Sequence, residues 1–273
     1  MTGTVLFGDD ASASADLAWM WINAQRWADW DIDVLTAEPA LEIGGDSSIQ
    51  PWQPRRPRAF FNAAAAPPIR HLRSTADPRV AMLACRDRDL IVLGARGHGL
   101  LKAMHLGSTA DWLMHNPPAP LVIARRGLPV RRAAVCTDGS ADALAAAGTL
   151  ARLPWVADVE VSVIAVQQPG LDAGQAVEQT AAPLAGTARR VRLVPLAGPD
   201  EAFSHVRDVI LEHVAAEGSD LIVQGTTGQS RWSALRAGSI ATSLATHAPC
   251  SVLMVHDHAR SAATVVPAQE GRP

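Results

Sequence analysis

The chain carries one sequence unit twice. Asp89-Leu-Ile-Val-Leu-Gly94 and Asp220-Leu-Ile-Val-Gln-Gly225 match at five of six positions and lie 131 residues apart. Four more pairs have the same separation: Gly97 with Gly228, Gly107 with Gly238, Ser108 with Ser239 and Pro118 with Pro249. Self-similarity over so long a period predicts two copies of one domain.

The length of 273 residues fits two domains of ordinary size. Upstream of the strictly spaced part, Asp10 pairs with Asp138 at a separation of 128, so the intervening loops differ in length. Residues 125–132 contain a glycine and a proline and interrupt the pattern between the two units. We therefore expect a first domain at 1–128, a second at 129–258 and a flexible tail at 259–273.

Each unit alternates short apolar runs with longer amphipathic segments. In the second unit we expect strands near 132–137, 159–166, 191–196, 221–225 and 251–256, and helices near 141–152, 174–187, 200–216 and 238–247. This alternation predicts an α/β fold in which helices cover both faces of a parallel sheet. The first unit departs from the pattern at 39–68, where six prolines stand in place of a helix and predict an irregular connection. Trp52, Phe60 and Phe61 either fold this connection back on the domain or form a contact surface.

The composition excludes several classes of protein. A net charge of -3 gives no electrostatic reason to expect nucleic acid as a partner. The three cysteines lack the paired spacing of a zinc or redox site and are expected to be buried thiols in a reducing compartment. There is no leader-like N-terminus and no apolar stretch of about 18 residues, so we expect a cytoplasmic protein that does not enter a membrane.

Each unit ends a buried strand on Gly-x-x-Gly, continues for nine residues, and then presents Gly-Ser before an apolar helix. Glycines at the carboxyl end of a strand let backbone N–H groups approach a phosphate, and a Gly-Ser helix start offers further donors. Ligands of open parallel sheets bind at this edge. The glycines could instead only form turns and the serines only cap helices, but two gap-free copies favour an anion site.

These motifs, with Ala134-Val-Cys-Thr-Asp138-Gly-Ser140 and His247-Ala-Pro-Cys-Ser-Val-Leu-Met-Val255, resemble the universal stress protein family. Its nucleotide-binding members carry Gly-x2-Gly-x9-Gly-[Ser/Thr] after strand four and an Asp at the end of strand one. The resemblance covers nearly the whole chain, twice, and is that of a tandem-type member. It implies two open five-stranded parallel sheets of order 3-2-1-4-5, Rossmann-like and similar to the adenine nucleotide alpha hydrolases, with ATP across the carboxyl ends of strands one and four.

The resemblance also implies the residues that would hold the nucleotide. In the first repeat they are Asp10, Thr36, Gly94, Arg96, Gly97, Gly107, Ser108 and Thr109; in the second they are Asp138, Val166, Gly225, Thr227, Gly228, Gly238, Ser239 and Ile240. The aspartates would hold adenosine, Thr36 and Val166 would flank adenine, and the others would surround the phosphates.

Neither site is a perfect copy of the family pattern. Asp9, beside Asp10, is expected to add negative charge near an anionic ligand, and Thr227 replaces a basic residue that Arg96 retains. The phosphate end of the site therefore favours the first repeat, and the adenosine end favours the second.

Other chemistry finds little support. The chain has neither a Walker phosphate loop nor a Gly-x-Ser-x-Gly elbow, the histidines lack metal-ligand spacing, and no catalytic residue is assigned. Trp19, Trp27 and Trp30 could stack on bases, but without a basic stripe they are expected to be core residues.

We therefore expect a stress-response protein that binds ATP, ADP or AMP, with or without Mg, and regulates an unknown protein partner. A nucleotide-free docking scaffold is the alternative, and a slow ATPase comes third. Family members commonly dimerise through the last strand, so 121–125 and 251–256 are expected to pair within the chain, with Val122 and Leu253 at one interface. A homodimer is also compatible with the sequence.

Overall fold

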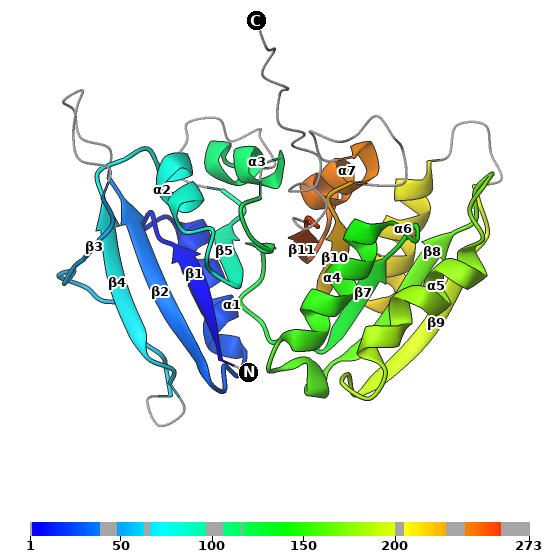
Figure 1. The fold of residues 1–273 in the computed structure, drawn as a ribbon, viewed down its shortest axis with the longest axis horizontal. Coiled ribbons are helices and arrows are strands. Elements are labelled where there is room, and N and C mark those ends of the chain that lie inside the picture. The colour runs from blue at the N-terminus through cyan, green and yellow to red at the C-terminus, as the bar shows by residue number, and fades with distance from the viewer. Residues whose placement is uncertain are drawn as a thin grey trace, which may run out of the picture.

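The computed structural model of the chain describes residues 2–38, 48–62, 66–96, 106–115, 117–199, 205–227 and 238–257. In these parts the strands form one continuous sheet of eleven, in the order β3-β4-β2-β1-β5-β6-β11-β10-β7-β8-β9 (Figure 1). The strands are β1 Gly3–Gly8, β2 Trp30–Ala37, β3 Gln50–Pro51, β4 Ile69–Ser74, β5 Leu90–Gly94, β6 Leu121–Ala124, β7 Arg132–Cys136, β8 Glu160–Val166, β9 Arg190–Leu196, β10 Leu221–Gly225 and β11 Ser251–Val255.

Each half of the sheet has the predicted order. β4-β2-β1-β5-β6 and β9-β8-β7-β10-β11 are both 3-2-1-4-5, and all pairs within each set are parallel. The two halves are not separate sheets, however, because β6 pairs antiparallel with β11 at the centre of the molecule. Val122 lies directly opposite Leu253, as the sequence predicts, and both side chains are fully buried. The short strand β3 adds an antiparallel edge that the sequence did not predict.

Helices cover both faces of the sheet. α1, α4 and α5 pack on one face, and α2, α3, α6 and α7 pack on the other. The helices are α1 Ala13–Ala24, α2 Pro78–Ala84, α3 Ser108–His115, α4 Ala141–Arg152, α5 Ala173–Ala181, α6 Val206–Glu217 and α7 Ser239–His247, with short 3-10 turns at Val156–Asp158 and Ala182–Leu184. α5 ends earlier than expected, in the turn that contains Pro183, because proline supplies no N–H to continue an α-helix. Among the described helices, none has the length and apolar character that a bilayer crossing requires.

Aromatic packing joins the two repeats on the α1 face of the sheet. The ring of Trp155 meets those of Trp21 and Trp27 edge to face, with centroids 6.0 and 6.4 Å apart. Gln25 donates to the Leu128 carbonyl oxygen and accepts from the Val130 N–H, which ties α1 to the segment between the repeats. Trp19, Trp27 and Trp30 are all buried, so they are core residues as expected and not a base-stacking surface.

The proline-rich connection folds back on the first repeat. Phe60 packs edge to face on Trp19, whose Nε1 donates to the Ala59 carbonyl oxygen at 3.1 Å, while Phe61 stays 80% exposed. Arg58 forms a bidentate ion pair with Asp9, with both N–O distances 2.7 Å. Arg58 also pairs with Asp16 at 2.6 Å, so one guanidinium is shared by two carboxylates and offsets only part of the negative charge expected beside Asp10.

Candidate functional site

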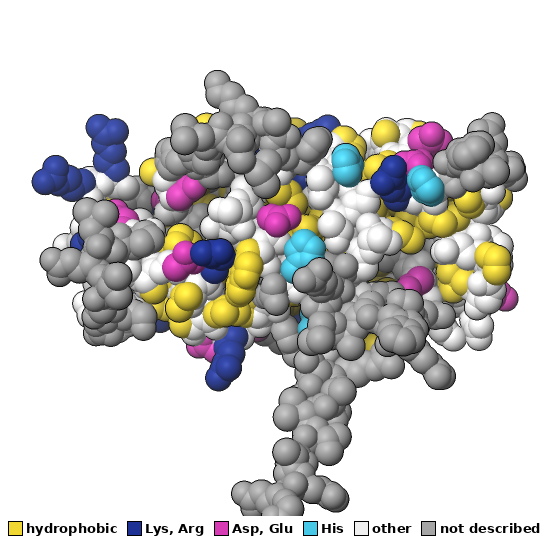
Figure 2. All heavy atoms as spheres, turned by 90° about the horizontal axis from the view of Figure 1, so that it is seen from above, with side chains coloured by type: hydrophobic (Ala, Val, Ile, Leu, Met, Phe, Trp, Pro, Cys, Tyr) yellow, Lys and Arg dark blue, Asp and Glu magenta, His cyan; other side chains and the backbone are white. Residues whose placement is uncertain are grey.

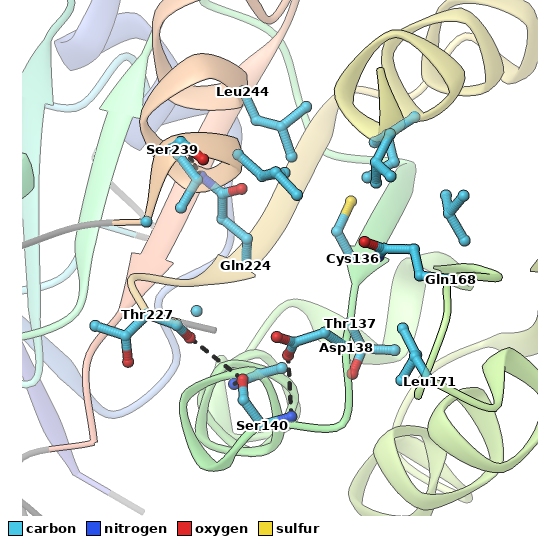
Figure 3. A pocket seen from close by; sticks show the side chains of 18 of the residues that line it. Cys136, Thr137, Asp138, Ser140, Gln168, Leu171, Gln224, Thr227, Ser239 and Leu244 are labelled. Carbon is cyan, nitrogen blue, oxygen red and sulfur yellow. Dashed lines mark hydrogen bonds between the residues drawn. The ribbon is translucent and has the colours of Figure 1, made fainter. Parts of the chain in front are cut away.

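A cavity of about 570 Å³ opens at the carboxyl ends of β7, β8 and β10 in the second repeat (Figure 3). Helices α4, α6 and α7 and the loop after β8 contribute the rest of its wall. Seven of the eight residues implied for the second repeat line it: Asp138, Val166, Gly225, Thr227, Gly238, Ser239 and Ile240. The eighth, Gly228, lies outside the described residues. The topology thus gathers residues from across the second repeat around one space.

One end of the cavity is suited to an anion. Gly238 precedes α7 in extended conformation and donates its N–H to the Thr226 carbonyl oxygen at 2.7 Å, which closes the loop between β10 and α7. α7 then begins at Ser239, so the N–H groups of its first turn lack partners within the helix. Ser239 and Ile240 of this turn line the cavity. Such a helix start favours negative charge.

The opposite end is largely apolar with a few polar groups. Val166 and Leu171 line it, and Figure 3 shows Gln168 beside Leu171 and Cys136 beside Gln168, whereas Leu244 lies in α7 next to Ser239. Burial raises the pKa of the Cys136 thiol to about 12, so this side chain stays neutral and acts as a small apolar wall. The dimensions and lining match those of cavities that hold ligands of nucleoside size.

Gln224 is a cavity residue that we did not predict. It occupies the single position at which the Asp-Leu-Ile-Val-x-Gly copies differ, and its Nε2 donates to the Ala241 carbonyl oxygen at 2.8 Å. The difference between Leu93 and Gln224 at this position could therefore have indicated that Gln224 has a role in the second repeat. Gln168, Leu171 and Ile210 had no such signal, since they belong to segments without a motif.

Gly225 has a packing role that the resemblance did not imply. A Cβ at this position would lie 2.6 Å from the Asp142 Cβ and 2.8 Å from the Ala143 nitrogen. Gly94 is equally confined, because its Cβ would lie 2.5 Å from the Ser14 carbonyl oxygen. Both glycines therefore let the helix that follows the first strand of each repeat approach the end of the fourth strand.

Asp142 ties three elements together behind the cavity. Its Oδ2 accepts from the hydroxyl of Thr226 at 2.9 Å, and from the N–H and hydroxyl of Thr227 at 2.9 and 2.6 Å. Its Oδ1 accepts from the Asp257 N–H at 2.9 Å, and His256 Nδ1 lies 3.2 Å from Oδ2. Burial would raise the pKa of this carboxyl, but the hydrogen bonds from His256, Thr227, Asp257 and Thr226 outweigh burial and hold it well below its usual range. Asp142 is therefore an ionised anchor for the loop after β10.

We expect His256 to titrate above the ordinary histidine pKa of about 6.5. The hydrogen bond to Asp142 raises the pKa of His256, against the lowering effect of burial. Because the folded-state pKa exceeds the unfolded one, the pair stabilises the fold below about pH 6.5 and this contribution is lost as the pH rises through the folded pKa. Imidazole proton shifts would measure the titration, with His256→Gln to assign the signal. A pKa at or below the ordinary value would contradict the assignment.

The equivalent region of the first repeat is differently filled. Asp10 follows β1, Thr36 lies in β2, Gly94 ends β5, and Arg96 comes shortly after it. Gly107 precedes α3, which begins with Ser108 and Thr109, and Gly97 lies outside the described residues. Gly8 occupies the position of Cys136, and a Cβ there would lie 2.4 Å from the side chains of both Leu93 and Met82. The buried side chains of Leu93 and Met82 therefore fill the space next to Gly8. In the second repeat the equivalent residue, Cys136, lines the cavity.

Comparison with known proteins places these features in a family. Residues 62–125 and 129–256 match the universal stress protein family. The fold is similar to that of a universal stress protein from Archaeoglobus fulgidus DSM 4304, at 16% identity and a TM-score of 0.68, over 94% of this chain and 99% of that one. A functionally unknown protein from Pseudomonas aeruginosa PAO1 is similar at 12% identity and a TM-score of 0.61, over 96% and 95%.

One universal stress protein solved in complex with cAMP is 23% identical, with a TM-score of 0.37, over 46% of this chain and 97% of that one. No curated protein matches the chain. The family match extends over most of the chain and into both repeats. The chain therefore belongs to the universal stress protein family, as a tandem-type member.

Proposed function

We propose that the second repeat binds an adenine nucleotide or nucleoside in the cavity at the ends of β7, β8 and β10, and that this ligand regulates the contacts of the protein with a partner. The observation that carries the proposal is the coincidence of one cavity with seven residues assigned beforehand from the family motif. The alternating apolar and polar wall fits a base and a sugar, and the start of α7 fits a phosphate.

Different lining residues would contact the base, the sugar and the phosphate of the ligand. Val166 and Leu171 supply apolar surface for the base, and Asp138 supplies a carboxylate to accept from sugar hydroxyls. Asp138 is held for this task, because its Oδ1 already accepts the Ser140 N–H at 3.0 Å (Figure 3). The N–H groups at the start of α7 then face the phosphate side.

Binding, and not catalysis, is the activity that these residues support. The described lining contains four hydroxyl groups, those of Thr137, Ser140, Thr227 and Ser239. The Thr137 hydroxyl hydrogen-bonds that of Thr180, and the Thr227 hydroxyl donates to Asp142. Ser140 caps α4 through the Ala143 N–H while donating to the Thr227 carbonyl oxygen. A serine engaged in this way serves the helix start. Regulation through bound ligand therefore ranks ahead of slow ATP hydrolysis.

The proposal is tested by the ligand that the purified full chain carries or accepts. Heat-released material is separated by nucleotide chromatography, and the stripped protein is then titrated with adenosine, AMP, ADP, ATP and cAMP, with and without Mg, by calorimetry. An adenine compound that is retained or binds supports the proposal. A protein that retains none and binds none acts as a nucleotide-free scaffold, and the proposal is then wrong.

A further inference from the structure

Thr226 and Thr227, which follow β10 at the second-repeat cavity, are anchored by a negative charge. Asp142 is only 4% exposed and does not line the cavity. It lies directly behind Thr227, which does line the cavity. Its carboxylate is kept ionised by its hydrogen bonds. Any phosphate placed beside Thr227 therefore has a buried anion close behind it.

The first repeat makes the same backbone contact without this charge. Ser14 occupies the position of Asp142, and its Oγ accepts the Arg96 N–H at 2.9 Å, just as Asp142 accepts the N–H of Thr227. A hydroxyl is therefore sufficient to hold this loop against the helix. The carboxylate in the second repeat adds an electrostatic effect that the loop geometry does not require.

Among the described residues around the cavity, no charge reverses the sign of this effect. His256 is the cationic partner that the structure places on Asp142, and its protonation brings the pair at most to neutrality. Asp257 acts on the same histidine as a second carboxylate, and Asp138 lines the cavity itself. Among the lining residues in the described ranges, none is lysine or arginine. Figure 2, a view onto the carboxyl ends of the strands, shows acidic and histidine side chains interspersed with basic ones over this edge.

We infer that Asp142 makes the second-repeat site selective for adenine ligands with at most one phosphate group, such as adenosine, AMP or a cyclic monophosphate, over ATP. This inference rests on the proposed function. The start of α7 stabilises one phosphate, whereas each further phosphate brings negative charge toward the carboxylate behind Thr227. Specificity then comes from repulsion of the more highly charged ligand.

The test compares ligands in the full chain. Calorimetry gives the ratio of the ATP affinity to the AMP affinity for wild type, Asp142→Ser and Asp142→Asn. Serine is the residue that the first repeat uses, and asparagine keeps the shape of the side chain. Glu212→Gln removes one exposed negative charge from α6 and serves as the control. We expect wild type to bind AMP at least as tightly as ATP. Both Asp142 variants should raise the ratio by about five- to tenfold, and added salt should reduce the difference.

The outcomes separate the two proposals. If the substitutions only loosen the loop, the affinities for AMP and ATP should fall together and the ratio of the ATP affinity to the AMP affinity should stay unchanged. That result in both variants overturns the role of Asp142. Wild type that binds ATP more tightly than AMP overturns it as well. If wild type binds no adenine compound, the proposed function fails and this inference fails with it.

Discussion

Leu253→Lys is expected to destabilise the chain by about 4 kcal/mol and to separate the two repeats. Leu253 is fully buried in β11, directly opposite Val122 in β6. The pairing of these two strands joins the sheets of the two repeats into one. A lysine there places an unpaired ammonium group among apolar side chains, where no water solvates it. Val122→Lys should act in the same way. The urea midpoint measures the loss, and limited proteolysis of 125–132 reports the separation.

Leu128→Lys is the matched control for this prediction. It makes the same chemical change in the segment between the repeats, at a side chain that is 56% exposed. Its effect should stay within about 0.5 kcal/mol. If Leu253→Lys and Leu128→Lys unfold at the same urea concentration, the β6–β11 junction does not hold the repeats together.

Asp138→Ala should weaken binding of adenosine or AMP by about tenfold to a hundredfold, the value of a lost hydrogen bond to a carboxylate. Asp138 lines the cavity and points toward it in Figure 3. Asp10→Ala is the matched control, because the Oδ1 of Asp10 accepts the Ser12 N–H at 3.0 Å just as that of Asp138 accepts the Ser140 N–H. Both variants lose the same local hydrogen bond to the backbone, so a difference between their calorimetric affinities measures the contact of Asp138 with the ligand. Equal weakening by the two variants would show that Asp138 has no special role.

The positions of the strands were predictable from the repeat, whereas their order in the sheet came from the resemblance to the universal stress protein family. Two copies of one unit must fold alike, so the strands of the second repeat could be assigned to within about two residues and carried to the first. The pairing of β6 with β11 followed from two apolar last strands that need cover, together with the resemblance to a family that commonly dimerises through this strand. It was not evident from this reasoning that the pairing would produce one unbroken sheet.

The cavity of the second repeat could not be predicted from the motifs alone. The glycine and serine positions are the same in both repeats, and the difference lies in the side chains around them. Leu93 and Met82 fill the space beside Gly8, whereas Cys136 and Gln224 line a cavity. Such filling depends on the packing of a strand against a helix, which spacing along the chain does not report.

The long-range charge pairs were also beyond sequence reasoning. Arg58 reaches Asp9 and Asp16 from a connection that appeared irregular, and it joins both carboxylates in one ion-pair cluster. Asp142 and His256 are 114 residues apart and meet only because β11 lies beside β10. No local motif marks either pair.

The most direct test of the central claim is a crystal structure of the full chain grown with AMP. We predict AMP at full occupancy in the second repeat, with the base against Val166, the sugar hydroxyls at Asp138 and the phosphate at the start of α7. AMP bound instead at the ends of β1 and β5 in the first repeat, or a structure in which the second-repeat cavity holds only water at saturating AMP, would contradict the account.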